Sequence, residues 1–243
     1  MEWIDLTFDG PVENLAADEV LLDGIESGQR EPTIRFWEPS SSFVVLGHGK
    51  KWLEEVDVAG CESLRIPILR RCSGGGTVLQ GPGCLNYALV LPFDEAGELS
   101  TIQKTNRYVM ERHRALFETL LREPVLVEGH TDLTRGGRKF SGNAQRRRRR
   151  SLLFHGTFLL RLDLFLMGQA LRHPPIEPAY RGGRAHDRFL VNLELGVDDV
   201  KAALRKAWGA RTASTTPPPP DFFEAVRQLA ASRHEDPKWT RQC

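Results

Sequence analysis

The sequence predicts an α+β fold in which helices flank a central mixed, largely antiparallel sheet. Three observations support this class. Segments with the apolar spacing of helices alternate with short runs that are rich in β-branched and aromatic residues. Several of those runs are joined by connections too short to contain a crossover helix, which favours antiparallel pairing. The composition, with 40% hydrophobic and 27% charged residues, is that of a globular protein.

Three segments have the periodicity of amphipathic helices, and we predict helices over residues 14–27, 101–121 and 197–208. In the second segment, Ser100 and Gln103 have the spacing of a capping box, in which two side chains satisfy backbone N–H groups at the helix start. Strands are favoured by the β-branched and aromatic runs between the helices. The predicted strands are residues 33–37, 43–46, 65–69, 87–91, 125–127, 140–144 and 152–160.

The length of 243 residues fits one large domain with a small appendage. Residues 217–220 are four consecutive prolines, which cannot lie inside a helix and therefore mark a joint. Beyond them, Asp221 and Glu224 have the spacing of a capping box for a short helix over residues 222–231. We predict a main domain over residues 1–211. Residues 212–243 are expected to form a proline-rich joint, a C-terminal helix and a tail that pack on that same domain.

The cysteines and the apolar runs indicate the cellular compartment. Cys61, Cys72, Cys84 and Cys243 show neither a Cys-x-x-Cys pair nor zinc-ligand spacing, which is typical of reduced intracellular thiols and predicts no metal site formed by the protein. The first residues lack the basic and apolar regions of a signal peptide, and no apolar run approaches the ~20 residues that span a bilayer. We expect a cytoplasmic protein without a membrane partner.

The formal net charge of +1 conceals an uneven distribution. Residues 133–162 contain eight arginines and one lysine but no acidic residue, so this segment carries +9 and the rest of the chain −8. Five of the arginines are consecutive, from Arg146 to Arg150. Such a run indicates a solvated hairpin tip, a docking patch for an acidic protein or a contact with nucleic acid. Nucleic acid is the least favoured, because no aromatic residues interleave with the arginines.

A glycine-rich segment with the sequence RRCSGGGTV occupies residues 70–78, directly after a predicted strand. Consecutive glycines let the backbone approach a ligand closely and turn its N–H groups toward an anion. The preceding Arg70 and Arg71 can neutralise a phosphate or a carboxylate. The spacing matches neither a P-loop nor a dinucleotide-binding fingerprint. A tight turn flanked by solvated arginines would give the same pattern, so the residues alone leave both interpretations open.

A second segment, GGRKFSGNAQ at residues 136–145, places Lys139 between glycines and a predicted strand, inside the +9 segment. The sequence Phe-His-Gly-Thr follows at residues 154–157. A single lysine on a hairpin is commonly a solvated charge. Here the small neighbouring residues leave space for a ligand, so we treat Lys139 as a candidate site residue.

Taken together, these residues resemble the lipoate–protein ligase A family, within the larger group of biotin/lipoate A/B protein ligases and octanoyltransferases. The resemblance covers most of the chain, and its motifs occur in the family's order. They are NLAADE at residues 14–19, FWEP at 36–39 with VVLG at 44–47, the triple-glycine loop, GHTDL at 129–133, GRKFSGNA at 137–144, HGT at 155–157 and Trp239 in the tail. The resemblance implies a biotin/lipoate ligase-like catalytic domain.

Ligases of this family activate lipoate with ATP to an acyl-adenylate and transfer the acyl group to a lysine of an acceptor domain. The resemblance implies lipoate or octanoate as substrate, ATP and Mg²⁺ as cofactors, and an acidic lipoyl-acceptor domain as partner. It makes Lys139 the catalytic residue, bridging the acyl and α-phosphate oxygens. It assigns to ATP the residues Arg71, Gly76, Thr77, Val78, Leu79 and Lys139, and to the acyl substrate Arg70, Ser73, Gly74, Gly75, Asn86, Ser141 and Gly142.

The sequence departs from the family pattern in three places. Gln80-Gly81 stands where many ligases have His-Asp, and glutamine cannot act as an acid or a base. The following Gly-Pro-Gly is closer to the octanoyltransferase branch, yet no cysteine matches either of that branch's nucleophile positions, and we expect Cys84 to be a buried thiol. Only 88 residues follow His155, too few for the ligases' extra C-terminal domain. If activation needs that domain, we expect a separate accessory subunit; alternatively, the protein performs only the transfer step.

These departures leave three hypotheses. The first is an acyl-adenylate-forming ligase of the lipoate–protein ligase type. The second is an octanoyl- or lipoyl-transferase that takes its acyl group from a carrier protein without ATP. The third is a non-catalytic relative that binds an acyl ligand or a partner domain.

Overall fold

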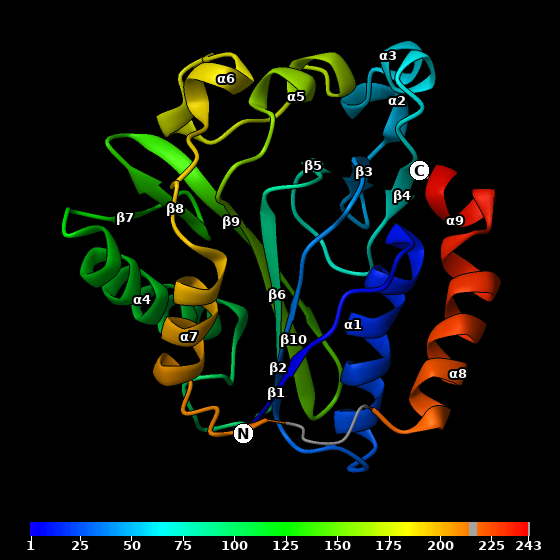
Figure 1. Ribbon diagram of the computed structural model, residues 1–243, viewed down its shortest axis with the longest axis vertical. Helices are drawn as coiled ribbons and strands as arrows, with labels where there is room; N and C mark the ends of the chain where they lie inside the picture. The colour runs from blue at the N-terminus through cyan, green and yellow to red at the C-terminus, as the bar shows by residue number, and fades with distance from the viewer. Residues whose placement is uncertain (214–217, 243) are drawn as a thin grey trace.

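The computed structural model describes residues 1–213 and 218–242 and contains two sheets (Figure 1). The large sheet has eight strands in the order β11-β1-β2-β6-β10-β9-β8-β7. Strands β1 and β2 and strands β1 and β11 pair in parallel, whereas the other neighbours are antiparallel. Its strands are β1 (Glu2–Asp5), β2 (Thr33–Trp37), β6 (Cys84–Pro92), β7 (Leu126–Glu128), β8 (Asp132–Arg135), β9 (Arg138–Arg147), β10 (Ser151–Leu159) and β11 (Thr212–Ala213).

The small sheet has the order β4-β3-β5 and lies beside one end of the large sheet (Figure 1). Its strands are β3 (Phe43–Leu46), β4 (Ile68–Arg70) and β5 (Val78–Gln80). Strand β3 pairs in parallel with β4 and antiparallel with β5. The loop between β4 and β5 is the glycine-rich segment, so this sheet holds both ends of that loop.

Helices cover both faces of the large sheet. On one face lie α4 (Ile102–Leu121) and α7 (Val197–Ala207), and on the other lie α1 (Pro11–Glu26) and α8 (Pro220–Leu229) (Figure 1). Short helices gather at the end that carries the small sheet. They are α2 (Trp52–Glu55), α3 (Val58–Ser63), α5 (Leu164–Ala170), η1 (Ala179–Arg181) and α6 (His186–Phe189). The chain ends in η2 (Ala230–His234) and α9 (Pro237–Arg241).

Consecutive side chains of a strand point in opposite directions, and the central strand β6 is buried on both faces of the sheet along most of its length. In β6, Tyr87 and Leu89 pack with the residues of α4 and α7, while Ala88 and Val90 pack with those of α1 and α8. All four side chains are fully buried. The resulting three-layer arrangement confirms the predicted α+β class with a mixed, largely antiparallel sheet.

The predicted elements differ from the structure at several ends. The α4 cap is Thr101, whose hydroxyl accepts from the Lys104 N–H, and not the predicted pair of Ser100 and Gln103. The capping box at Asp221 and Glu224 is wrong, because α8 begins at Pro220, two residues before the predicted start, and Glu224 contacts Arg227 and Gln228 instead.

Strand β4 starts only at Ile68, since Arg65 has a left-handed φ of 54° after α3. The strands β1, β5, β8 and β11 were not predicted at all. Part of the predicted proline-rich joint, residues 214–217, lies outside the described residues. Within the described part of the chain, no helix is long and apolar enough to cross a membrane.

A buried ion pair ties α1 to the sheet. Arg35 of β2 is fully buried, and its Nη1 lies 2.6 Å from Asp18 Oδ1. The same guanidinium donates to the Asn14 side chain and to the Leu6 carbonyl, so each of its nitrogens is satisfied. A buried charge needs this degree of pairing because its desolvation is expensive.

We predict that Asp18→Ala lowers the free energy of unfolding by about 3 kcal/mol or more, because it leaves the Arg35 charge buried without its carboxylate. Urea denaturation followed by circular dichroism measures the loss. Asp23→Ala is the matched control. Asp23 lies on the same helix but pairs with Arg148 at the surface, so its loss should stay below about 1 kcal/mol. Equal losses for the two variants would contradict the role of the buried pair.

Candidate active site

A cavity of about 740 Å³ lies between residues of the two sheets and of the short helices. Its volume is in the range of small-molecule and cofactor sites. Apolar side chains from α1, β2, β3, α5 and α6 line part of it, including Leu15, Trp37, Val45, Met167 and Phe189. Charged and amide side chains from β5, β6, β8, β9 and β10 line the remainder. An amphiphilic ligand with an apolar chain and a polar end suits such a lining.

Lys139 lies inside this cavity, near the start of β9. Its Nζ is 2.8 Å from Asp132 Oδ1 on the neighbouring strand β8. The second carboxylate oxygen of Asp132 accepts a 2.7 Å hydrogen bond from the Tyr180 hydroxyl. Burial and the adjacent carboxylate raise the pKa of Tyr180, so this hydroxyl remains a donor. Asp132 is therefore held from both sides, and the ammonium is held by Asp132.

Local backbone features give Lys139 this position. Gly136 and Gly137 both have positive φ and form the turn between β8 and β9. A register shift between Leu133 and Thr134 adds an irregularity to the β8–β9 ladder. Gly142 leaves room for the lysine side chain, because a Cβ at this position would lie only 2.7 Å from the Lys139 Nζ. The glycine thus leaves the space that the ammonium fills.

Arg71 holds the glycine-rich loop from inside. Its Nη2 donates to the carbonyls of Gly74 and Gly76, and its Nε donates to the Ser73 hydroxyl. Burial lowers the pKa of Arg71 to about 10, which still leaves the guanidinium charged at neutral pH. The loop is therefore shaped by a buried cation that lines the same cavity as Lys139.

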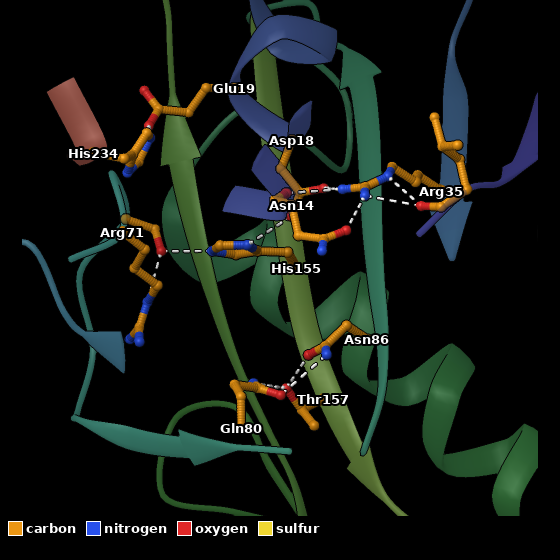
Figure 2. Close-up of polar contacts among 12 residues, drawn as sticks. Asn14, Asp18, Glu19, Arg35, Arg71, Gln80, Asn86, His155, Thr157 and His234 are labelled. Carbon is orange, nitrogen blue, oxygen red and sulfur yellow. Dashed lines mark hydrogen bonds and ion pairs between the residues drawn. The ribbon is translucent and has the colours of Figure 1, made fainter. Parts of the chain in front are cut away.

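A chain of polar contacts connects this loop to α1 (Figure 2). The Ser73 hydroxyl lies 2.5 Å from His155 Nε2, and the other ring nitrogen of His155 lies 3.6 Å from Asp18 Oδ2. Asp18 is the carboxylate that pairs with Arg35. His155 and Asp18 line the cavity, whereas Ser73 is buried behind it.

Three further polar side chains of the cavity bind one another in a closed ring (Figure 2). Gln80 Nε2 donates to the Thr157 hydroxyl over 2.6 Å, Thr157 donates to Asn86 Oδ1, and Asn86 Nδ2 donates to Gln80 Oε1 over 3.0 Å. These residues come from β5, β10 and β6, so the ring joins the small sheet to the large one.

The predicted site residues lie mostly together. Those that line the cavity are Arg71, Gly75, Gly76, Thr77, Val78, Leu79, Asn86, Lys139, Ser141 and Gly142. Ser73 and Gly74 belong to the same loop but do not line the cavity.

Arg70, predicted to bind the acyl substrate, also lies outside the cavity lining. Its fully buried guanidinium donates to the carbonyls of Gly47 and His48 and to three carbonyls of the C-terminal tail, those of Trp239, Thr240 and Gln242. Consecutive residues of an extended chain point to opposite sides, which explains why Arg71 faces the cavity and Arg70 the tail.

Part of the segment from Tyr180 to His186 lies at the cavity. Arg181 lines the cavity and is buried, with its guanidinium carbon 4.8 Å from the centre of the Phe189 ring. Its Nη2 has no hydrogen-bond partner among the described residues. Arg184 donates to the Gly137 carbonyl and so connects this segment to the turn that precedes Lys139.

Arg147, Arg148 and Arg150 of the five consecutive arginines have side-chain partners within the chain. Arg147 donates to the Leu99 and Ser100 carbonyls and stacks over Phe93 at 4.0 Å, while Arg148 pairs with Asp23. Arg150 donates its backbone N–H to the Glu26 carboxylate and its Nη2 to the Glu26 carbonyl. The run is thus a hairpin tip that binds the end of α1 and the start of α4, which reduces the charge it offers to a partner.

The described residues place no cysteine thiol in the cavity lining and form no metal-binding cluster. Burial raises the pKa of Cys61 to about 11 and of Cys84 to about 12, and it also raises the pKa of Cys72. None of these three thiols lines the cavity, and Cys243 lies outside the described residues. Within residues 1–213 and 218–242, no cluster of three or more His, Cys, Asp or Glu side chains could hold a metal ion.

We predict that iodoacetamide at pH 7.5 labels Cys61, Cys72 and Cys84 about 100-fold more slowly than glutathione, because their thiolate fractions are small and burial limits access. Mass spectrometry of a Cys243→Ser background measures the three sites alone. Unfolding in urea should restore ordinary rates. Rapid labelling of any one site in the folded protein would contradict this prediction and make that thiol a candidate nucleophile.

The comparisons with known proteins agree with one another. The family model for the lipoyl protein ligase A/B catalytic domain matches residues 10–208. A lipoate-protein ligase A of Mycoplasma pneumoniae is 27% identical over 184 residues, which cover 76% of this chain and 52% of that protein. The octanoyltransferase LipM of Exiguobacterium sibiricum is 31% identical over 239 residues, which cover 85% of this chain and 86% of that protein. The chain thus spans about half the length of the Mycoplasma relative.

Two solved structures share the fold. A bi-partite lipoate protein ligase from the lipoylation system of Thermoplasma acidophilum, which also includes an E2 lipoyl domain, superposes with a TM-score of 0.83 at 22% identity. The match covers 99% of this chain and 95% of that one. A lipoate-protein ligase A bound with ATP superposes with a TM-score of 0.81 at 21% identity, over 99% and 98% of the two chains. The chain belongs to the lipoyl protein ligase A/B catalytic domain family.

Proposed function

We propose that the protein is a lipoate–protein ligase-like enzyme that activates lipoate or octanoate with ATP and transfers the acyl group to a lysine of an acceptor domain. The observation that carries this proposal is the position of the Lys139 ammonium. It lies inside the large cavity, in the space left by Gly142, and is held by Asp132. A cation with one fixed position suits a reaction in which two anionic groups must meet.

Acyl-adenylate formation joins a carboxylate to the α-phosphate of ATP and releases pyrophosphate. The two reactants repel each other, and negative charge grows on the α-phosphate oxygens as the new bond forms. We propose that Lys139 lies between the acyl carbonyl and the α-phosphate and stabilises that charge. Its pairing with Asp132 orients it beforehand, so little reorganisation is needed when the substrates arrive.

We propose that the nucleotide is held by Arg71 and by the backbone from Gly76 to Leu79, which line one side of the cavity. Arg181 adds a buried guanidinium with an unused N–H donor. The acyl group is proposed to contact Gly75 of the glycine loop, together with Asn86, Ser141 and Gly142, while Ser73 and Gly74 belong to that loop without lining the cavity. For Arg70 we propose an indirect role, since its contacts with the tail hold the base of that loop.

Mg²⁺ fits this site as an ion carried by the ATP phosphates. Magnesium in nucleotide sites commonly keeps several waters and uses only one or two protein carboxylates. The described residues offer no multidentate metal cluster, but Glu55 and Asp132 are carboxylates of the cavity lining. When bound, the ion would offset phosphate charge.

The partners of the reaction are part of the proposal. We propose an acidic lipoyl domain as acceptor and a separate accessory ligase subunit, in a cytoplasmic setting. The Thermoplasma system supports the idea of a divided ligase, because its ligase is bi-partite and is accompanied by an E2 lipoyl domain. Residues 1–211 remain our proposed catalytic domain, with residues 212–243 packing on it.

The alternative is an ATP-independent octanoyltransferase. It is favoured by the 31% identity to an octanoyltransferase LipM and by the Gly81-Pro82-Gly83 sequence. Against it, none of the three described thiols lines the cavity, and burial raises the pKa of each. A thiol of that kind is a poor nucleophile for a thioester intermediate.

The deciding experiment supplies the protein with octanoate or lipoate, Mg²⁺ and ATP labelled at the α-phosphate, with and without a candidate accessory subunit. We expect acyl-adenylate and pyrophosphate in equal amounts. Absence of adenylate under both conditions would overturn the ligase proposal. Transfer from an octanoylated carrier protein without ATP would then establish the alternative.

We predict that Lys139→Met lowers the rate of acyl-adenylate formation about 100- to 1000-fold, because the variant keeps the volume of the side chain but loses its charge. Lys51→Met is the matched control, since Lys51 is exposed and pairs only with Glu54. Both variants should remain folded, as judged by circular dichroism. Substantial turnover by Lys139→Met would show that the catalytic cation lies elsewhere.

A further inference from the structure

Four cavity residues lie in register across four adjacent strands. Asn86 of β6 pairs with Thr157 of β10, Thr157 pairs with Gly142 of β9, and Gly142 pairs with Asp132 of β8. Directly opposed residues of antiparallel strands project from the same face of a sheet, and neighbouring strands lie about 4.8 Å apart. The four positions therefore form a straight row across the floor of the cavity.

The position of Gly142 in this row has no side chain of its own. A Cβ placed there would meet the Lys139 Nζ at 2.7 Å and its Cε at 2.8 Å. The lysine ammonium therefore occupies the place of the missing side chain, between Thr157 and Asp132. In order across the four strands, the row therefore consists of an amide, a hydroxyl, an ammonium and a carboxylate.

The ring of Gln80, Asn86 and Thr157 determines which atoms the row offers to a ligand. Each side chain in the ring donates once and accepts once, so the amide groups cannot rotate freely. Each amide nitrogen carries two N–H groups and uses only one of them in the ring. Neither nitrogen has another partner among the described residues, and both side chains line the cavity while being at most 5% exposed.

We infer that this ring and the Lys139 ammonium together form one carboxylate-binding row. Gln80 and Asn86 donate their spare N–H groups to the acyl carboxylate, and Lys139 supplies the charge beside them. Thr157 is a positioning residue that orients both amides through its hydroxyl. The inference rests on the proposed function only in taking an acyl carboxylate as the ligand. This inference assigns a binding role to Gln80.

The first test measures the binding of octanoate by isothermal titration calorimetry in the absence of ATP. Thr157→Val has nearly the same shape but cannot exchange hydrogen bonds, so it should weaken octanoate binding roughly ten-fold. Thr157→Ser retains the hydroxyl and should bind within about two-fold of the wild type. Octan-1-ol, which has the same chain without a carboxylate, should bind equally to all three proteins.

The second test combines Thr157→Val with Gln80→Met, which keeps an unbranched side chain without donors. Because Thr157 acts through the amides of Gln80 and Asn86, the double variant should lose about as much octanoate affinity as the worse single variant, and not the product of the two losses. Unchanged octanoate binding by Thr157→Val would overturn the inference. So would an equal loss of octan-1-ol affinity, since it would indicate a general packing defect.

These experiments distinguish a failure of the proposed ligase function from a failure of the carboxylate-binding row. Octanoate binding is measured without ATP. If the Thr157 and Gln80 variants show the predicted losses of octanoate affinity but the wild type forms no acyl-adenylate, the proposed ligase function alone is contradicted. A wild-type protein that forms adenylate while its Thr157 and Gln80 variants bind octanoate normally would contradict the row alone.

Discussion

The ion pair between Lys139 and Asp132 is the constraint around which the cavity is organised. An ammonium in a half-enclosed site must be paired or it loses much of its hydration energy. Here the partner comes from the adjacent strand, and the space comes from a glycine three residues along the same strand. The two glycines of the β8–β9 turn and the register shift beside it are consistent with this arrangement. Tyr180 then secures the free oxygen of Asp132.

Several buried arginines of this chain stabilise the fold through hydrogen bonds and ion pairs. Arg35 anchors α1, Arg70 joins the glycine loop to the C-terminal tail, and Arg71 holds the carbonyls of that loop from within. Guanidinium groups suit this work because each has several donors in a rigid plane and stays charged when buried. The tail contributes in return, because the Trp239 indole and His234 both reach the Arg70 carbonyl. The loop is therefore held between two arginines that face opposite ways.

The sequence predicted the fold class well because apolar periodicity is a local property. The strand at residues 33–37 and the strand at 43–46 were placed at their true bounds, and the long helix before residue 121 was found within one residue. The missed strands β1, β5 and β8 are at most four residues long, too short for a period to show. Their place depends on pairing with distant segments.

For the site, motif order indicated the lysine and the glycine loop, but not their partners. The relation of Asp132 and Thr157 to Gly142 depends on strand register across two antiparallel pairings, which no local pattern encodes. Arg70 and Arg71 are identical neighbours in sequence, and only the direction of the strand separates a cavity residue from a tail contact. The five consecutive arginines were likewise ambiguous until their partners on α1 and α4 were placed.

The account is tested most directly by a crystal structure of this protein with a non-hydrolysable acyl-sulfamoyl adenosine, which mimics the acyl-adenylate. The account predicts that the Lys139 Nζ lies within about 3 Å of both the acyl carbonyl oxygen and a sulfamoyl oxygen. It would be contradicted by a ligand bound in the cavity with its acyl linkage away from Lys139, while the ammonium still contacts Asp132 alone.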